Sequence, residues 1–363
     1  MPPDPLDLYT LTVAAPRRAA DFAQRAEAAG WAGMAVVDSQ NLSGDAYVAL
    51  TMAATRTETL GLATAVTNPI TRHPAVTASA IASVQAISNG RATLGIGRGD
   101  SALAHLGRAP ASVALLTAYL ETLQTYLRGE AVPFDGLSFH EKMAPDVASL
   151  GLADSAEASR ITWLPDARPK VEVEVAATGP RVIGVAARLA DRVMFALGAN
   201  PERIAWGITT AREARKAAGL EPDALRFGSY VNMVCHSNVE TARQLASGGL
   251  TTFARFQVMH GKQSGPVAET QRRVLDDLHD RYDMKHHTQS GSPQTKTLTP
   301  EFIDAFAIVG PPEHCVERLR ELASLGVERI IVIGPSAGSD RDDAKRAEQM
   351  LSSEVLPEFS ATR

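Results

Sequence analysis

Residues 91–101 read Arg91-Ala-Thr-Leu-Gly-Ile-Gly-Arg-Gly-Asp100-Ser101. The apolar run from Ala92 to Ile96 predicts a buried strand, and the glycines that follow it predict a turn. Glycine lets the backbone approach a ligand closely, and the guanidinium of Arg98 offers a planar fork of hydrogen-bond donors. We therefore predict a strand that ends in an anion-binding turn. The residues of this turn are Gly97, Arg98, Gly99, Asp100 and Ser101.

The same alternation of strand and helix extends over most of the 363 residues. Short apolar runs alternate with helical patterns of roughly 10 to 17 residues, as they do in parallel βα units. We predict eight strands, at residues 8–13, 33–37, 60–67, 92–96, 171–177, 192–197, 227–235 and 329–333. An open doubly wound sheet usually has fewer strands, so eight units predict a closed (β/α)₈ TIM barrel. We expect it to form a single domain over residues 1–363.

Nine helices are expected between and after these strands, at residues 16–30, 46–55, 74–87, 111–127, 180–189, 201–218, 239–250, 311–325 and 341–351. Two stretches depart from the alternation. Residues 129–169 have no sustained period, and residues 251–300 are helical only over 267–282 and end in a polar segment. We predict that both are insertions, after strands four and seven, and that the second one is a lid over the site.

The composition limits the class of protein. An apolar content of 45% with 21% charged residues is typical of a globular chain with a large core. A net charge of −5 argues against nucleic acid or an anionic membrane as the main partner. We find no signal peptide and no apolar stretch of about 18 residues, and we expect a cytoplasmic protein. Cys235 and Cys315 are expected to be reduced core thiols, and no metal site is predicted.

In a barrel the ligand site lies at the carboxyl ends of the strands. Thr178-Gly179-Pro180-Arg181 follows the fifth strand and predicts a second anion site there. A proline at the first helical position after a glycine leaves backbone N–H groups free, with a hydroxyl and a positive charge nearby. The alternative, without a role in ligand binding, is an ordinary helix start with a solvated arginine. Residues 334–336 are a competing anion site, which ranks lower because it has no basic residue.

Other polar residues follow the second and third strands. Asn68 carries both a donor and an acceptor, as the edge of a pyrimidine-like ring requires. His73 and His105 are candidate proton donors, although a histidine before a helix-starting proline, as at position 73, is more often structural. The pair His286-His287 has no acidic or cysteine partner at metal-ligand spacing, and we expect it in a solvated loop.

These segments resemble a known superfamily. Residues 89–91 followed by 94–99 are similar to the fourth strand of the bacterial luciferase-like flavin monooxygenases, and residues 22–33 fit the same superfamily. Residues 67–74, and residues 177–181 with 189–191, are particularly similar to its methylenetetrahydromethanopterin reductase branch, which uses a deazaflavin coenzyme. The resemblance implies a barrel with extra segments after strands four and seven. It also implies an isoalloxazine-type ring at the strand ends, with its phosphate between the turns after strands four and five.

The resemblance also implies the roles of residues. Arg98 matches the phosphate-binding arginine of the luciferase-type pattern, and Gly179 and Arg181 match the anion site at a helix start. The predicted cofactor-binding set is Asp38, Asn68, Gly97, Arg98, Gly99, Asp100, Ser101, Ala177, Thr178, Gly179, Pro180 and Arg181. The predicted catalytic set is His73, His105 and Asp38.

Two positions depart from the family patterns. The reductase branch usually has proline where this chain has Arg98, and luciferases carry a histidine pair where it has Asp38 to Asn41. Arg98 therefore favours FMN as the cofactor. The resulting hypothesis is a two-component monooxygenase that oxidises a small organic substrate with oxygen, using reduced FMN from a separate flavin reductase. The resemblance also implies a homodimer.

Two alternatives remain open. The first is hydride transfer with an 8-hydroxy-5-deazaflavin coenzyme and no oxygen chemistry. The tail of that coenzyme is anionic, so a basic groove beyond Arg98 and Arg181 would favour it, with Arg72 and Arg108 as candidate members. The second is a non-redox barrel that binds a phosphorylated ligand.

Overall fold

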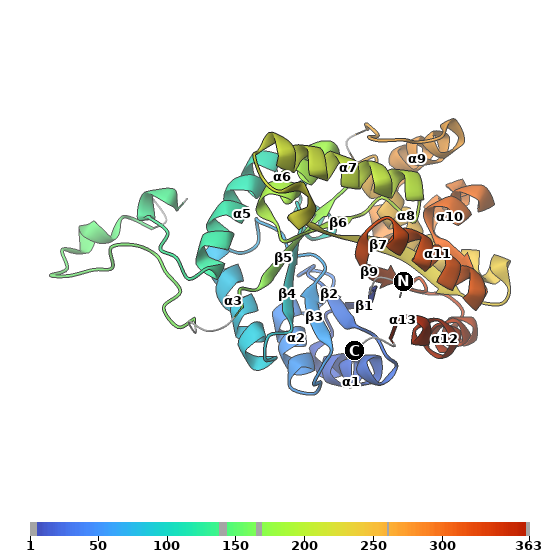
Figure 1. Ribbon diagram of the computed structural model, residues 1–363, viewed down its shortest axis with the longest axis horizontal. Helices are drawn as coiled ribbons and strands as arrows, with labels where there is room; N and C mark the ends of the chain where they lie inside the picture. The colour runs from blue at the N-terminus through green and yellow to red at the C-terminus, as the bar shows by residue number, and fades with distance from the viewer. Residues whose placement is uncertain (1–5, 138–143, 165–168, 260, 361–363) are drawn as a thin grey trace.

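The computed structural model describes residues 6–137, 144–164, 169–259 and 261–360. Eight of its nine strands pair in parallel in the order β1-β2-β3-β4-β5-β6-β7-β9, and β9 pairs back with β1 (Figure 1). They are β1 (Asp7–Val13), β2 (Gly33–Val37), β3 (Gly61–Thr64), β4 (Ala92–Ile96), β5 (Glu172–Ala177), β6 (Arg192–Phe195), β7 (Arg226–Cys235) and β9 (Val327–Ile333). The predicted closed (β/α)₈ TIM barrel is therefore confirmed.

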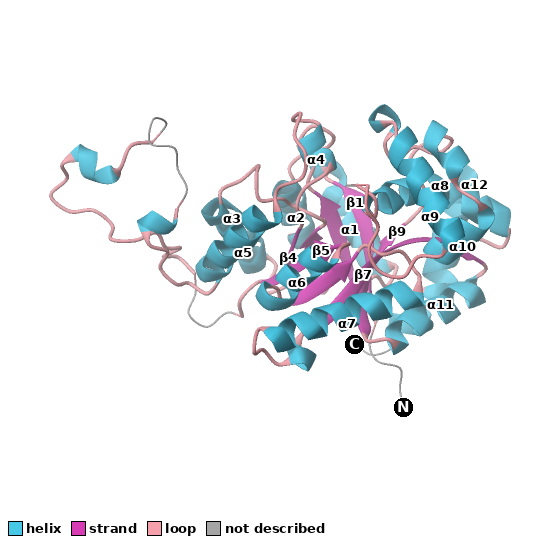
Figure 2. Ribbon diagram, turned by 90° about the horizontal axis from the view of Figure 1, so that it is seen from above, coloured by secondary structure: helices cyan, strands magenta, loops and turns pink. Residues whose placement is uncertain are grey.

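Helices surround the barrel on its outer side (Figure 2). They are α1 (Pro16–Ala28), α2 (Ala46–Ala54), α3 (Pro74–Ile87), α5 (Val113–Leu127), α6 (Pro180–Leu189), α7 (Pro201–Ala217), α8 (Val239–Phe256), α11 (Pro312–Ser324) and α12 (Arg341–Met350). Several of these start at a proline, whose fixed φ suits the first helical turn. The starts of α3 and α6 accordingly match the predicted residues. No helix among the described residues is long and apolar enough to cross a bilayer.

Strand β3 is shorter than predicted because its register with β4 shifts by one residue after Thr64, from Ala63 opposite Thr93 to Thr67 opposite Ile96. The amide of Thr67 donates to the carbonyl of Gly95 at 3.0 Å, and the amide of Gly97 donates to the carbonyl of Thr67 at 3.0 Å. The peptide between Ala65 and Val66 is cis. Residues 65–67 thus form a bulge against the end of β4. They bring the loop after β3 to the predicted anion-binding turn, residues 97–101, which we call the glycine turn.

Several elements of the structure were not predicted. Helix α4 (Ser101–Ala104) follows the glycine turn directly, and α10 (Pro300–Phe306) precedes the short strand β8 (Ile308–Gly310). Strand β8 pairs with Met233 to Cys235, at the end of β7 beyond the barrel. Helix α8 runs to Phe256 instead of residue 250, so the second insertion starts later than predicted and contains α9 (Glu269–Arg281). A short helix, α13 (Pro357–Ser360), ends the described chain.

The first insertion leaves the barrel beside α3 and α5, and its described part extends away from the other elements (Figures 1 and 2). Its base is an antiparallel bridge between Val132 and Ser159. Two short 3₁₀ turns, Phe134–Gly136 and Val147–Leu150, contain no buried residue. Residues 138–143 and 165–168 of the predicted insertion lie outside the described residues.

The amino-terminal end of the barrel interior is filled by an aromatic ring and by charges. A Cβ atom on Gly61 would lie 2.0 Å from the phenol oxygen of Tyr9, so that position requires glycine. Nη1 of Arg329 lies 2.5 Å from Oε1 of Glu174, and Nε of Arg192 lies 3.0 Å from the same oxygen. Arg192, Arg329 and Glu174 are all buried. Tyr9 and these charged side chains occupy the barrel interior at this end, and the predicted ligand site lies at the opposite, carboxyl ends of the strands.

Candidate active site

The glycine turn after β4 packs directly on the loop after β3. A Cβ atom on Gly97 would lie 3.1 Å from Cγ2 of Val66. Gly99 has a φ of +79°, and a Cβ atom there would lie 2.9 Å from Cβ of Asn68. A side chain at position 99 would be strained and would also collide. The glycines predicted from the sequence are therefore needed for the close approach of these two loops.

Asn68 presents an unused donor at this junction. Its Oδ1 accepts hydrogen bonds from the amides of Ile70 and Thr71, at 3.0 and 3.1 Å. The side chain is 1% exposed, and its Nδ2 has no hydrogen-bond partner among the described residues. A buried donor without a partner costs free energy, so a ligand acceptor at this position would be stabilising. This geometry agrees with the ring-edge role predicted for Asn68.

The two predicted anion sites lie side by side, because β4 and β5 are paired through Ile96 and Val175. Nε of the partly buried Arg98 donates to the carbonyl of Ala111 at 2.5 Å. Burial and the nearby positive charge of Arg181 both lower the pKa of Arg98. An anion between two guanidinium groups relieves such repulsion, so this pair fits a phosphate.

The start of α6 completes this cradle. Ala177 is the buried last residue of β5, Thr178 is half-buried, and Gly179 precedes Pro180 without any side-chain cap. The N–H groups of the first turn of α6 are therefore available to a ligand. A Cβ atom on Gly179 would meet only Oγ of Ser264, at 4.0 Å, so residues of the second insertion border this turn.

Asp38, at the end of β2, is 3% exposed, and both of its carboxylate oxygens accept hydrogen bonds from Arg72. Arg72 also pairs with Asp45 at 2.7 Å, and its guanidinium lies 4.9 Å from the centre of the Tyr47 ring. Burial alone would lower the pKa of Arg72, but the hydrogen bonds and charges of Asp38 and Asp45 outweigh burial and raise it. Arg72 is thus held by two carboxylates, whereas Arg108 is exposed.

The two candidate histidines have different surroundings. His73 caps α3, because its Nδ1 accepts the amide of Ala75 at 3.2 Å, and burial lowers its pKa. Nδ1 of His73 is therefore used at the start of α3. His105 is exposed and follows α4, with its Nδ1 2.8 Å from the carbonyl of Ser101. The catalytic roles of His73, His105 and Asp38 stay predictions.

The end of α8 and the second insertion supply contacts to the glycine turn that the sequence did not predict. Arg255 forms an ion pair with Asp100 and lies 4.6 Å from the centre of the Tyr282 ring. Nε2 of His287 lies 2.8 Å from Oγ of Ser101. We predicted that both histidines of the pair lie in a solvated loop. This prediction is confirmed for His286, which is exposed, and is wrong for His287, which is half-buried against the glycine turn. The segment has no hydrophobic period, so only the folded chain reveals these contacts.

In the competing anion site after β9, residues 334–336, the hydroxyl and the amide of Ser336 already form hydrogen bonds within the protein. Oγ of Ser336 accepts the amide of Gly249 at 3.0 Å, and the amide of Ser336 donates to the carbonyl of Leu245. These contacts hold α8 over β9. Phe253 of the same helix packs on Tyr230 inside the barrel, with ring centres 5.9 Å apart. Helix α8 therefore borders the carboxyl-end site on the side of β7 and β9.

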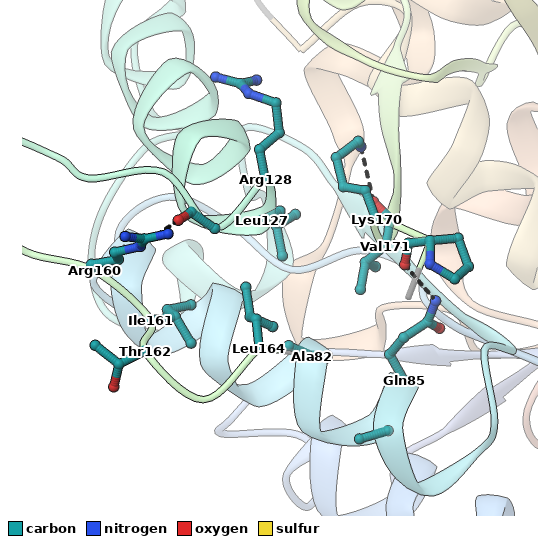
Figure 3. A pocket seen from close by; sticks show the side chains of 13 residues that line it. Ala82, Gln85, Leu127, Arg128, Arg160, Ile161, Thr162, Leu164, Lys170 and Val171 are labelled. Carbon is teal, nitrogen blue, oxygen red and sulfur yellow. Dashed lines mark hydrogen bonds between the residues drawn. The ribbon is translucent and has the colours of Figure 1, made fainter. Parts of the chain in front are cut away.

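Two cavities lie at the other end of the molecule. One, of about 540 Å³, lies between the ends of α3 and α5 and the chain before β5 (Figure 3). Gln85 borders it and donates to the carbonyl of Pro169 at 3.4 Å. The other, of about 480 Å³, lies at the amino-terminal end of the barrel near Tyr9 and Arg329. Neither cavity includes the residues of the glycine turn, so neither is the predicted cofactor site.

Comparisons with known proteins cover nearly the whole chain. The model of a family described as luciferase-like monooxygenase matches residues 4–329. A 5,10-methylenetetrahydromethanopterin reductase of Archaeoglobus fulgidus is 26% identical over 348 residues, which cover 93% of this chain and 94% of that protein.

Solved structures have the same fold. A coenzyme F420-dependent tetrahydromethanopterin reductase of Methanopyrus kandleri has a TM-score of 0.70 and 20% identity, covering 98% of this chain and 99% of that one. An F420-dependent secondary alcohol dehydrogenase, solved with an F420-acetone adduct, has a TM-score of 0.73 and 15% identity over the same shares. At these identities the structures establish the architecture alone.

Proposed function

The chain belongs to the luciferase-like monooxygenase family, and on that basis we propose that it is a deazaflavin-dependent oxidoreductase that transfers hydride without oxygen chemistry. The similarity to a methylenetetrahydromethanopterin reductase over 93% of the chain favours this alternative over the FMN monooxygenase. Two F420-dependent enzymes among the solved structures also support it. The substrate would be a small organic molecule that gives or accepts two electrons and a proton.

The observation that supports a phosphate-bearing cofactor, whether the deazaflavin coenzyme or FMN, is the pair of guanidinium groups at two adjacent strand ends. The charge of Arg181 lowers the pKa of Arg98, and the start of α6, the helix that carries Arg181, has no side-chain cap. A cofactor phosphate bound between the two guanidinium groups would interact favourably with both. Gly97 and Gly99 keep the backbone close to the ligand, and the unpaired Nδ2 of Asn68 is a donor for an acceptor on the ring.

When bound, the deazaflavin ring supplies or accepts the hydride, and the protein supplies its position. Asn68 would orient one edge of the ring by a hydrogen bond. The ion pair of Asp38 with Arg72 fixes a polar boundary at the end of β2. His73 is the candidate proton donor near this site, and its Nδ1 is used at the start of α3.

Arg98 is the reason to retain an FMN-dependent monooxygenase as a second candidate function. The reductase branch usually has proline where this chain has Arg98, and an arginine there is the luciferase-type phosphate ligand. In addition, Arg72 is neutralised by two carboxylates, so the basic groove that an anionic tail would require is smaller than predicted. The choice between the two cofactors therefore needs a direct binding measurement.

We expect the purified protein to bind the oxidised deazaflavin coenzyme F420 tightly and reduced FMN weakly. Both affinities are measured by anaerobic fluorescence titration. Arg98→Ala should weaken F420 binding about tenfold or more, because one charged hydrogen-bonding partner of the phosphate is lost. Arg56→Ala is the matched control, since it removes an exposed arginine between α2 and β3, away from the carboxyl ends of the strands. Tighter binding of FMN than of F420 would reverse the choice, and equal affinities for the two arginine variants would remove Arg98 from the phosphate site.

A further inference from the structure

Two segments far apart in the sequence are joined by a row of hydrogen bonds. Oγ of Ser101, at the start of α4, lies 2.8 Å from Nε2 of His287, and Nδ1 of His287 lies 2.8 Å from the phenol oxygen of Tyr282. That oxygen lies 3.0 Å from Oγ1 of Thr252 in α8. Both ring nitrogens of His287 are thus occupied, one on the glycine turn and one on the second insertion.

The charge of Arg255 decides the direction of these hydrogen bonds. Its guanidinium lies 4.6 Å from the centre of the Tyr282 ring and can only donate. A positive charge over the ring makes the phenol O–H a better hydrogen-bond donor. The ring nitrogen of a neutral imidazole accepts more strongly than a threonine hydroxyl, so Tyr282 donates to Nδ1 of His287. A neutral His287 must then carry its proton on Nε2 and donate to Ser101.

The hydroxyl of Ser101 is oriented as a result. Its oxygen accepts the proton of His287, so its own proton is directed to another acceptor. Ser101 belongs to the same turn as Arg98, and Asp100 is fixed to α8 by its ion pair with Arg255. Both neighbours restrict where this hydroxyl can point.

We propose that His287 is a positioning residue, which holds the Ser101 hydroxyl so that it donates to the cofactor phosphate. This proposal rests on the proposed function, because the phosphate is the acceptor, and it adds a residue of the second insertion to the cofactor site. Tyr282 acts one step further away, by fixing the tautomer of His287.

The test is a double-mutant cycle on the full chain, read as the dissociation constant of F420. Ser101→Ala and His287→Leu should each weaken binding about fivefold to tenfold, and the double variant should bind no more weakly than Ser101→Ala alone. His287→Gln should restore most of the affinity, because its amide can donate where Nε2 does. His286→Leu is the matched control, since it removes the adjacent exposed imidazole. Independent, additive effects of the two single variants would overturn the proposal.

A second readout does not depend on the cofactor. Nitrogen NMR of the ¹⁵N-histidine-labelled protein without cofactor should show His287 protonated at Nε2. In Tyr282→Phe this preference for protonation at Nε2 should be lost. Protonation at Nδ1 in the wild type would overturn the inference, whatever the cofactor is. If the wild type binds no F420, the proposed function fails, and the cycle is then read with reduced FMN while the tautomer still decides the role of His287.

Discussion

Single residues at the end of β4 determine how closely the two loops of the site can approach. A Cβ atom on Gly95 would lie 2.0 Å from the carbonyl oxygen of Thr64, which is backbone and cannot rotate away. The hydroxyl of Thr64 also donates to the carbonyl of Gly95 at 2.7 Å. We expect Gly95→Ala to lower the free energy of unfolding by about 3 kcal/mol, measured by urea denaturation.

Gly334→Ala is the control for that substitution, because nothing lies within 4 Å of a Cβ atom at position 334. It should change the free energy of unfolding by less than about 0.5 kcal/mol. Equal effects of the two substitutions would mean that the contact with Thr64 does not limit position 95.

At the level of elements, the contact between the second insertion and the glycine turn is sensitive to acid. Burial, together with the positive charges of Arg255 and His105, lowers the pKa of His287 to about 4, and its hydrogen-bonding neighbours are the hydroxyls of Ser101 and Tyr282. In the unfolded chain the same imidazole takes up a proton near pH 6.5. Stability is therefore unaffected by His287 above about pH 6.5 and falls as the pH drops from there to 4.

The expected size is about 3 kcal/mol over that window, obtained as the difference between wild type and His287→Gln in urea denaturation at several pH values. The other histidines contribute to both proteins alike and cancel. If both proteins lose the same stability between pH 6.5 and 4, His287 is not held neutral in the fold.

The same level shows what the sequence could predict. Helices that begin at proline and strands that end in glycine or polar residues carry their signal locally, which is why α3, α6 and β4 matched the prediction. Strand β8 and the contacts of His287 depend on neighbours far along the chain, and no local pattern encodes them. Of the candidate site, the sequence indicated the two anion turns and Asn68, but not the residues that the second insertion adds.

At the level of the whole molecule, a buried group of charges ties several strands together. Oε1 of Glu174 in β5 contacts Arg192 of β6 and Arg329 of β9. Glu174→Gln should lower the free energy of unfolding by about 3 kcal/mol or more, because two buried cations lose a shared counter-charge. Thermal and urea denaturation measure this loss.

Glu328→Gln provides the comparison, because Glu328 meets the same Arg192 at 3.2 Å but is 46% exposed. Solvent screens that pair, and the expected loss is below about 1 kcal/mol. A loss as large as that of Glu174→Gln would show that burial is not what makes the inner carboxylate important.

Pairing of the first and last barrel strands also has a consequence for how the chain folds. Leu8 of β1 lies opposite Ile330 of β9, so the sheet cannot close before almost all of the chain is available. During synthesis β1 has one open edge, and such edges pair readily with other chains. The closing step joins segments separated by most of the sequence, and contacts of that kind form slowly. We therefore expect a late, slow closing step in folding, during which the incomplete chain is most prone to aggregate.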